Sequence, residues 1–161
     1  MQIIQKDRQG KPASETAIDN HKIKIFDGNT SLDEVIFGGR VLNLVNDIAR
    51  EVATSHSEIK CNTVAVDSLR YFAPIKRGDI LICKVQVNNV WIEDNILEVG
   101  STVIAEDFRS LEQKKILSAY FIFKTIDDIE IPEVIPYSLD EKQRYLDAEK
   151  RKNIREKKSV S

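Results

Sequence analysis

The spacing of the apolar residues changes along the chain, and each change predicts a new element. Residues 21–26 alternate polar and apolar side chains before the turn formers at 27–29, which predicts a short strand. From about Glu34 to His56 the apolar residues recur at helical spacing and cover most of the circumference. A helix with so little polar surface is a buried helix, so we predict a long central helix in this region.

The predicted helix keeps one narrow polar stripe. Its residues are spaced i, i+3, i+4 and i+7, so they lie along one face: Asn43, Asn46, Asp47 and Arg50. We expect this stripe to meet water, a partner subunit or a ligand.

Four more strands are predicted after the helix, separated by turn signals. Their ranges are 62–73, 79–91, 95–107 and 114–126. The short connections favour hairpins between antiparallel neighbours. A long buried helix followed by an antiparallel sheet predicts an α+β domain of the hotdog type, in which the sheet wraps around the central helix. One copy would leave the polar stripe and a sheet edge unsatisfied, so we expect two copies to pair.

The two ends of the chain differ from this central part. We expect a flexible N-terminal segment at 1–17, the main domain at 18–136, and a charged C-terminal helical extension with its tail at 137–161. Ser138 is an N-cap candidate followed by acidic residues, which favours a helix start. The last segment carries a net charge of +3, but acidic residues are mixed through it. This pattern favours a solvated surface helix over a nucleic-acid-binding arm.

Length and composition narrow the function classes further. A chain of 161 residues with 42% hydrophobic residues fits one folded domain. Its net charge of -2 argues against a non-specific polyanion binder, so we expect no nucleic-acid partner. No stretch approaches the roughly 20 apolar residues of a membrane span. Because Cys61 and Cys83 lie in apolar strands without CxxC spacing, we expect free thiols and a reducing, cytoplasmic location.

Common catalytic motifs are absent from the sequence. We find no metal-ligand spacing and no glycine-rich phosphate loop, so we expect neither a metal nor a nucleotide cofactor. His21 and His56 are far apart and lack a nucleophile motif, so we interpret them as surface or helix-end residues. Both cysteines are interpreted as inert packing residues.

The pair Gly38 and Gly39 is unusual in the first turns of a buried helix, where each glycine costs up to about 1 kcal/mol relative to alanine. Two explanations are open. The glycines let a ligand approach backbone amides near the positive end of the helix, or they allow close packing of the helix start against the sheet.

Several motifs, in this order and spacing, resemble the hotdog-fold acyl-CoA thioesterase (acyl-CoA hydrolase) family. They are FGGRVL at 37–42, TVAVDS at 63–68, Phe72 with Pro74, and KRGD at 76–79. The resemblance runs from about Ile18 to Lys150 and includes the closing helix.

This resemblance implies hydrolysis of an acyl-CoA thioester, with CoA entering as part of the substrate and no separate cofactor. It also implies a double-hotdog homodimer, commonly assembled into a trimer of dimers, with each site formed between two subunits. In the FGG turn, here Phe37, Gly38 and Gly39, a backbone amide would donate a hydrogen bond to the thioester carbonyl. In the family a carboxylate follows the second glycine by seven residues, and this position is Asn46.

The departure at Asn46 leaves several candidates for the base, because an amide cannot take a proton near neutral pH. Asp47 is the nearest carboxylate, about 100° further around the helix. Asp33 or Glu34 of the facing chain could replace it. Asn29 could fill the role of a family asparagine in the preceding loop if that loop carries a two-residue insertion.

Three cations are candidates for the phosphates of CoA: Arg70, Lys76 and Arg77. Lys76 and Arg77 could equally be ordinary turn residues. Arg50, where the family commonly has a small residue, could narrow the acyl tunnel or pair with Asp47. We therefore carry two hypotheses, a thioesterase with Asp47 as leading carboxylate and a non-catalytic acyl-CoA-binding or regulatory protein.

Overall fold

The computed structural model describes residues 9–24, 34–76 and 78–159, with the backbone alone at 24 and 34–38. Its elements, in chain order, are β1 (Lys11–Pro12), α1 (Ala13–Thr16), β2 (Ile18–Lys24), α2 (Glu34–Ser57), β3 (Cys61–Tyr71), β4 (Ile80–Trp91), the 3-10 turn η2 (Ile92–Asp94), β5 (Ile96–Glu106), β6 (Gln113–Thr125), β7 (Val134–Ile135) and α3 (Leu139–Ser159).

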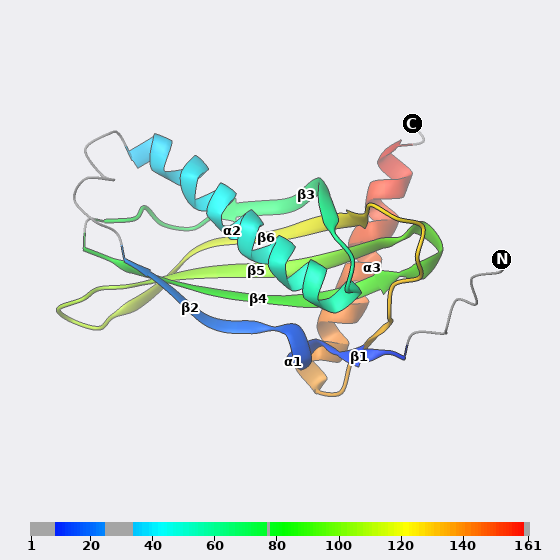
Figure 1. Cartoon of the computed structure of the whole chain (residues 1–161). Helices are drawn as coiled ribbons and strands as arrows, with labels where there is room; N and C mark the ends of the chain where they lie inside the picture. Colours follow the sequence, from blue (N-terminus) through cyan, green and yellow to red (C-terminus); the bar gives the residue numbers. More distant parts are fainter. Residues whose placement is uncertain (1–8, 25–33, 77, 160–161) are drawn as a thin grey trace.

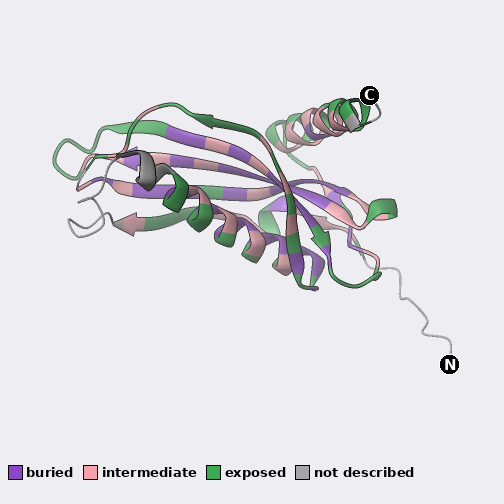
Figure 2. Cartoon of the chain, turned by 90° about the horizontal axis from the view of Figure 1, so that it is seen from above, coloured by how far each residue is buried: buried purple, intermediate pink, exposed green. Residues whose placement is uncertain are grey.

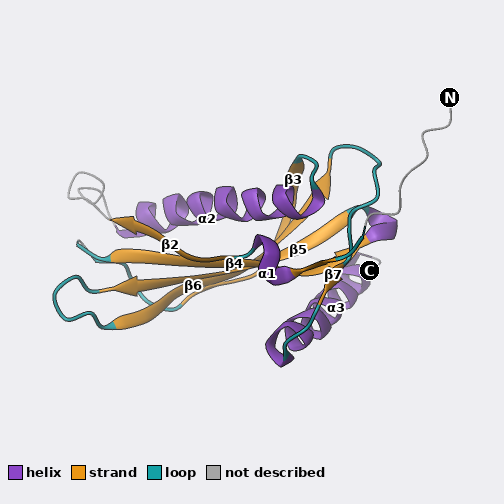
Figure 3. Ribbon diagram, turned by 60° about the horizontal axis from the view of Figure 1, so that its bottom comes forward, coloured by secondary structure: helices purple, strands orange, loops and turns teal. Residues whose placement is uncertain are grey.

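The main sheet has five strands in the order β2-β4-β5-β6-β3, and all its neighbours are antiparallel. The helix α2 lies along one face of this sheet, and α3 lies on the opposite face (Figures 1 and 3). This arrangement confirms the predicted hotdog fold with a central helix and a C-terminal helix. The four later strands agree with their predicted ranges to within two residues at each end. The first strand begins at Ile18, before its predicted start, and residues 25–26 of that prediction lie outside the described part of the chain.

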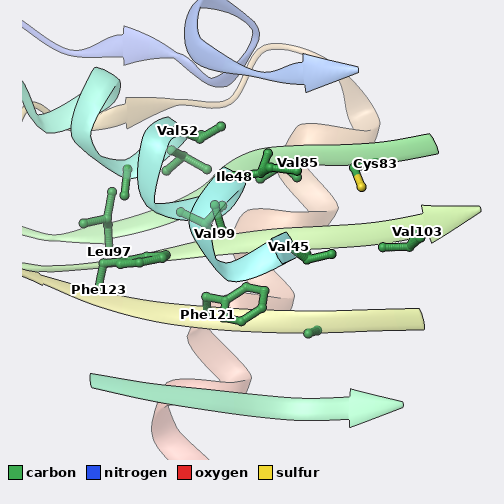
Figure 4. Packing of buried hydrophobic residues seen from close by; sticks show 14 of the residues in the cluster. Val45, Ile48, Val52, Cys83, Val85, Leu97, Val99, Val103, Phe121 and Phe123 are labelled. Carbon is green, nitrogen blue, oxygen red and sulfur yellow. The ribbon is translucent and has the colours of Figure 1, made fainter. Parts of the chain in front are cut away.

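The core lies between α2 and the sheet (Figure 4). Val45, Ile48 and Val52 of the helix contribute to the same buried cluster as Val99 and Phe121 of the strands. These side chains are almost fully buried, and each contributes about 1.5–3 kcal/mol on burial. Figure 2 shows the result, with buried residues on the sheet and on the side of α2 that faces it. The helical period of the sequence therefore decides which side of α2 packs.

The segment at 1–17 was expected to be flexible, and the structure shows that part of residues 9–17 packs against the rest of the chain. There β1 pairs in parallel with β7, and Ala13 is buried in the core. Lys11 donates from Nζ to the carbonyl oxygens of His56 at 3.0 Å and Ser55 at 3.5 Å, at the end of α2. A cation at a helix C-terminus is favourable because the last carbonyls lack partners within the helix.

The C-terminal helix α3 begins as predicted. The Ser138 hydroxyl accepts from the Glu141 amide, and the Glu141 carboxylate accepts from the Ser138 amide, both at 3.0 Å. This reciprocal pair is a capping box. As expected for a surface helix, most of α3 is exposed or half-buried, but one side packs against the sheet, where Ala148 is fully buried (Figure 3).

The histidines and cysteines take structural positions in the described part of the chain. His56 is completely buried at the end of α2, where its Nε2 bonds to the Pro132 carbonyl oxygen at 2.8 Å, whereas His21 is exposed. Burial lowers the pKa of His56. Cys61 and Cys83 are free and buried, as predicted, and burial raises the pKa of Cys83 to about 11. A thiol with a raised pKa forms little thiolate, which agrees with a packing role.

Candidate functional site

The polar residues of α2 and β3 meet where the central helix crosses the edge of the sheet. The Thr63 hydroxyl donates to the Asn46 side-chain oxygen at 2.8 Å, and both side chains are half-buried. Because its oxygen is occupied, the Asn46 amide nitrogen is left to donate to another group. Thr63 lies in the motif at 63–68, but its role was not predicted from the sequence. The available signal was a polar residue on the strand that follows the helix.

Asp47 follows Asn46 on α2 and is exposed. Its side chain is 68% exposed, and Arg50 donates to its carboxylate at 3.4 Å. The expected pairing of Arg50 with Asp47 is therefore confirmed. An exposed pair of this kind contributes only about 0–1 kcal/mol of stability. Breaking it to let the Asp47 carboxylate contact another group therefore costs little free energy.

Gly39 lies in open surroundings. It is exposed, and a Cβ atom added there would meet nothing within 4 Å among the described neighbours. Close packing against the described part of the sheet therefore does not explain Gly39. Gly38 also belongs to α2, which begins at Glu34. The two glycine amides thus lie beyond the first four N–H groups of the helix, which are the donors without an intrahelical partner.

Several predicted site residues lie at or beyond the limits of the described part of the chain. Asn29, Asp33 and Arg77 lie outside the described residues, and the side chains of Glu34 and Phe37 are not described. Their positions relative to Asn46 and Asp47 therefore lie outside the described part of the structure.

The remaining candidate cations are exposed. Arg70 lies near the end of β3, beyond an irregularity in its pairing with β6. Lys76 lies in the turn before β4, where its backbone amide donates to the buried Asp79 carboxylate at 2.9 Å. Gly78 in the same turn has φ of +84°, a conformation that favours glycine. The turn therefore has a structural explanation, while the ammonium group of Lys76 is presented to solvent.

Residues 9–24, 34–76 and 78–159 bear on two further kinds of feature, a metal centre and a membrane span. Within these ranges no three His, Cys, Asp or Glu side chains come together in a group that could hold a metal ion. No helix in this described part is long and apolar enough to cross a membrane.

Comparison with known proteins relates the chain to thioester hydrolases. The model of the Thioesterase superfamily matches residues 33–107. An uncharacterised acyl-CoA thioester hydrolase of Zymomonas mobilis is 31% identical over 126 residues, which cover 78% of this chain and 80% of the relative.

Solved structures share the fold over nearly the whole chain. A variant of the acyl-CoA hydrolase from Staphylococcus aureus, in complex with coenzyme A, is 26% identical with a TM-score of 0.84, covering 96% of this chain and 93% of that one. An apo-hexameric acyl-CoA thioesterase reaches a TM-score of 0.86 at 23% identity, covering 94% of this chain and 98% of that one. Both similarities extend over the sheet, the central helix and the C-terminal helix described above.

Proposed function

Because this chain belongs to the acyl-CoA thioester hydrolase family of the thioesterase superfamily, we propose that it hydrolyses an acyl-CoA to a free carboxylic acid and CoA. One observation supports particular residues for this reaction. Thr63 forms a hydrogen bond with Asn46, and the exposed carboxylate of Asp47 is next to Asn46 in the chain. Asn46 occupies the α2 position that the resemblance assigns to the reaction, Thr63 of β3 bonds to it, and Asp47 lies about 100° further around the helix. The substrates are the acyl-CoA and water, and no further cofactor is required.

In the proposed mechanism, Asp47 acts as general base. Its carboxylate takes a proton from water while the water oxygen attacks the thioester carbonyl carbon. The carbon–sulfur bond then breaks, and the proton passes to the departing CoA thiolate. Asn46 donates from its amide nitrogen to the carbonyl oxygen or to the water, because Thr63 holds its side-chain oxygen. This division of roles uses a carboxylate for the proton and an amide for orientation.

The backbone amides of Gly38 and Gly39 are the proposed carbonyl donors. In the single chain both residues are already helical, so this role requires α2 to begin near Gly38 when substrate binds. Glycine has a low helix propensity, and the open space around Gly39 allows such unwinding without a clash. Amides freed in this way would lie at the positive end of the shortened helix.

CoA binding is proposed at Arg70, Lys76 and Arg77, whose cations suit the phosphates of the nucleotide. The described cations, Arg70 and Lys76, are both exposed. Phe37 and Asn29 are proposed to contact the acyl and pantetheine part of the substrate. These assignments follow from the family resemblance, and solvent access to Arg70 and Lys76 supports them.

A homodimer is proposed to complete the site. The strand β3 lies at one edge of the sheet, and its exposed apolar residues include Val64, Val66 and Tyr71. Pairing through this edge would cover that surface and bring Asp33 or Glu34 of the facing chain toward α2. We propose a trimer of dimers as the larger assembly, supported by a structural neighbour that is described as hexameric. Light scattering during size-exclusion chromatography tests this assembly directly. We also propose a cytoplasmic location, consistent with the two free cysteines.

The experiment that tests the function is the release of CoA thiol from short-, medium- and long-chain acyl-CoAs by the purified chain. Asp47→Ala is expected to lower kcat by at least about 100-fold, the lower range for loss of a general base. Glu51→Ala is the matched control, because Glu51 is an exposed carboxylate one turn further along α2. Unchanged turnover in Asp47→Ala would remove Asp47 from the mechanism.

The second candidate function is a non-catalytic acyl-CoA-binding or regulatory protein. Asn46 favours it, because an amide occupies the position where the family carries a carboxylate. Under this alternative the native chain binds acyl-CoA without releasing CoA thiol, and Asn46→Asp gains turnover. Turnover by the native chain that disappears in Asp47→Ala supports the enzyme instead.

A further inference from the structure

The sheet face opposite α2 carries a buried ionic contact that the proposed reaction does not use. Glu98 of β5 is fully buried, and Arg151 of α3 donates to its two carboxylate oxygens at 2.6 and 3.2 Å. Asn88 donates to the same carboxylate at 3.1 Å. The Arg151 guanidinium also lies over the Tyr120 ring, 3.6 Å from its centroid. Arg151 therefore holds α3 against β5 and β6.

One helical turn further on, Arg155 reaches the edge strand. Its guanidinium donates to the Asp67 carboxylate at 2.6 Å and lies 3.8 Å from that of Glu98. The exposed fractions of the two side chains are only 26% for Arg155 and 22% for Asp67. Burial raises the pKa of Asp67, but hydrogen bonds from Arg155 and Ser68 outweigh it and hold this pKa below its ordinary value. The carboxylate is thus stabilised in its charged form.

The strand that Asp67 belongs to, β3, is paired on one side only within the described chain. In the described sheet, β3 is the edge strand next to β6, and its pairing is irregular between Thr63 and Ala65 and again between Asp67 and Arg70. Ser68, inside the second irregularity, has φ of +50°, a conformation that costs free energy for a residue with a side chain. Residues 65–67 are thus a short regular segment between two breaks, and the ion pair to α3 is formed at its end.

The two breaks separate this segment from residues of the proposed site. Before it, Thr63 bonds to Asn46 on α2, and after it comes Arg70, a proposed CoA contact. We propose that Arg155 is a positioning residue for the reaction: its ion pair with Asp67 fixes residues 65–67 of β3 and thereby the places of Thr63 and Arg70. This inference rests on the proposed thioesterase function. It gives α3 a role in activity from the face of the sheet opposite the site.

The test compares Arg155→Gln with Arg144→Gln in CoA-release kinetics. Arg144 is a matched control, because it pairs at 2.7 Å with Asp140 within α3 and not with the sheet. Both variants are assayed at a temperature where circular dichroism shows them fully folded. We expect Arg155→Gln to lower kcat/KM at least tenfold. Part of this loss should be a higher KM, because Arg70, a proposed CoA contact, would be displaced. Arg144→Gln should remain within twofold of wild type, and Arg155→Lys should recover part of the lost activity.

A double-mutant cycle shows whether Arg155 acts through Asp67. Asp67→Asn keeps Arg155 beside Glu98, so it tests the same contact if Arg155→Gln fails to fold. If Arg155 acts through Asp67, the double variant is no slower than the slower single variant. Full additivity of the two losses, or an Asp67→Asn variant with wild-type kcat/KM, overturns the inference while leaving the proposed function intact. A wild-type chain that releases no CoA from any acyl-CoA overturns the proposed function, and the inference with it.

Discussion

The hydroxyl of Thr63 and the side-chain oxygen of Asn46 are 2.8 Å apart, and this hydrogen bond joins the edge strand to the central helix. It determines which end of the Asn46 amide is free. With the oxygen accepting from Thr63, the amide nitrogen can donate to a substrate oxygen or to a water. At the position where the resemblance implies a carboxylate, this chain thus has an oriented hydrogen-bond donor.

Thr63→Val tests that orientation. Valine keeps the shape of the side chain but removes the hydroxyl, which leaves the Asn46 oxygen without its donor. A lost hydrogen bond is worth about 0.5–1.5 kcal/mol, so we expect kcat to fall up to about tenfold. Thr63→Ser retains the hydroxyl and should keep most of the activity. Equal rates in the valine and serine variants would show that this bond has no part in turnover.

Gly39→Ala separates stability from activity at the start of α2. Open space surrounds Gly39, and alanine favours a helix by about 0.8–1.0 kcal/mol over glycine. We therefore expect a higher Tm. If α2 must begin near Gly38 during the reaction, the same change lowers kcat because it makes unwinding harder. Ser55→Ala, at an exposed position of α2, is the control. A rise in Tm without loss of kcat would argue against the proposed unwinding.

Removing the buried contact between Glu98 and Arg151 is expected to lower the free energy of unfolding strongly. Arg151→Met removes the cation and leaves the fully buried Glu98 carboxylate without its main partner. Breaking a buried ion pair costs about 3–5 kcal/mol. Urea unfolding measures this loss, with Lys150→Met as control because Lys150 is exposed on the same helix. A loss below about 1 kcal/mol would mean that α3 is not held by this contact.

Because His56 is buried, we expect the free energy of unfolding to depend on pH. Burial lowers its pKa in the folded chain, so the unfolded chain binds more protons as the pH falls below about 6.5. The free energy of unfolding therefore decreases with falling pH through the window between 6.5 and the lowered folded pKa. In His56→Gln this part of the slope should disappear, while the loss from Asp67, whose pKa is lowered, appears only below about pH 4. Identical slopes between pH 6.5 and 5 in the two proteins would contradict the assignment to His56.

The local elements of this protein could be predicted from the sequence, because periodicity and caps are local properties. The helical spacing of apolar residues predicted α2, and alternation predicted the strands now seen as β3 to β6. The capping residues Ser138 and Glu141 similarly marked the start of α3. The short pairing of β1 with β7 was missed, because two residues at Lys11–Pro12 are too few to show a period.

The candidate site was only partly predictable for the same reason. Sequence by itself determined that a polar stripe with Asn46 and Asp47 interrupts a buried helix. Only the tertiary structure decided that Thr63 bonds to Asn46 and that Arg155 reaches Asp67, 88 positions earlier in the chain. Such contacts depend on strand order and on the faces that α2 and α3 cover. The apolar periodicity sets which side of each element is buried, whereas the packed sheet sets which polar groups meet.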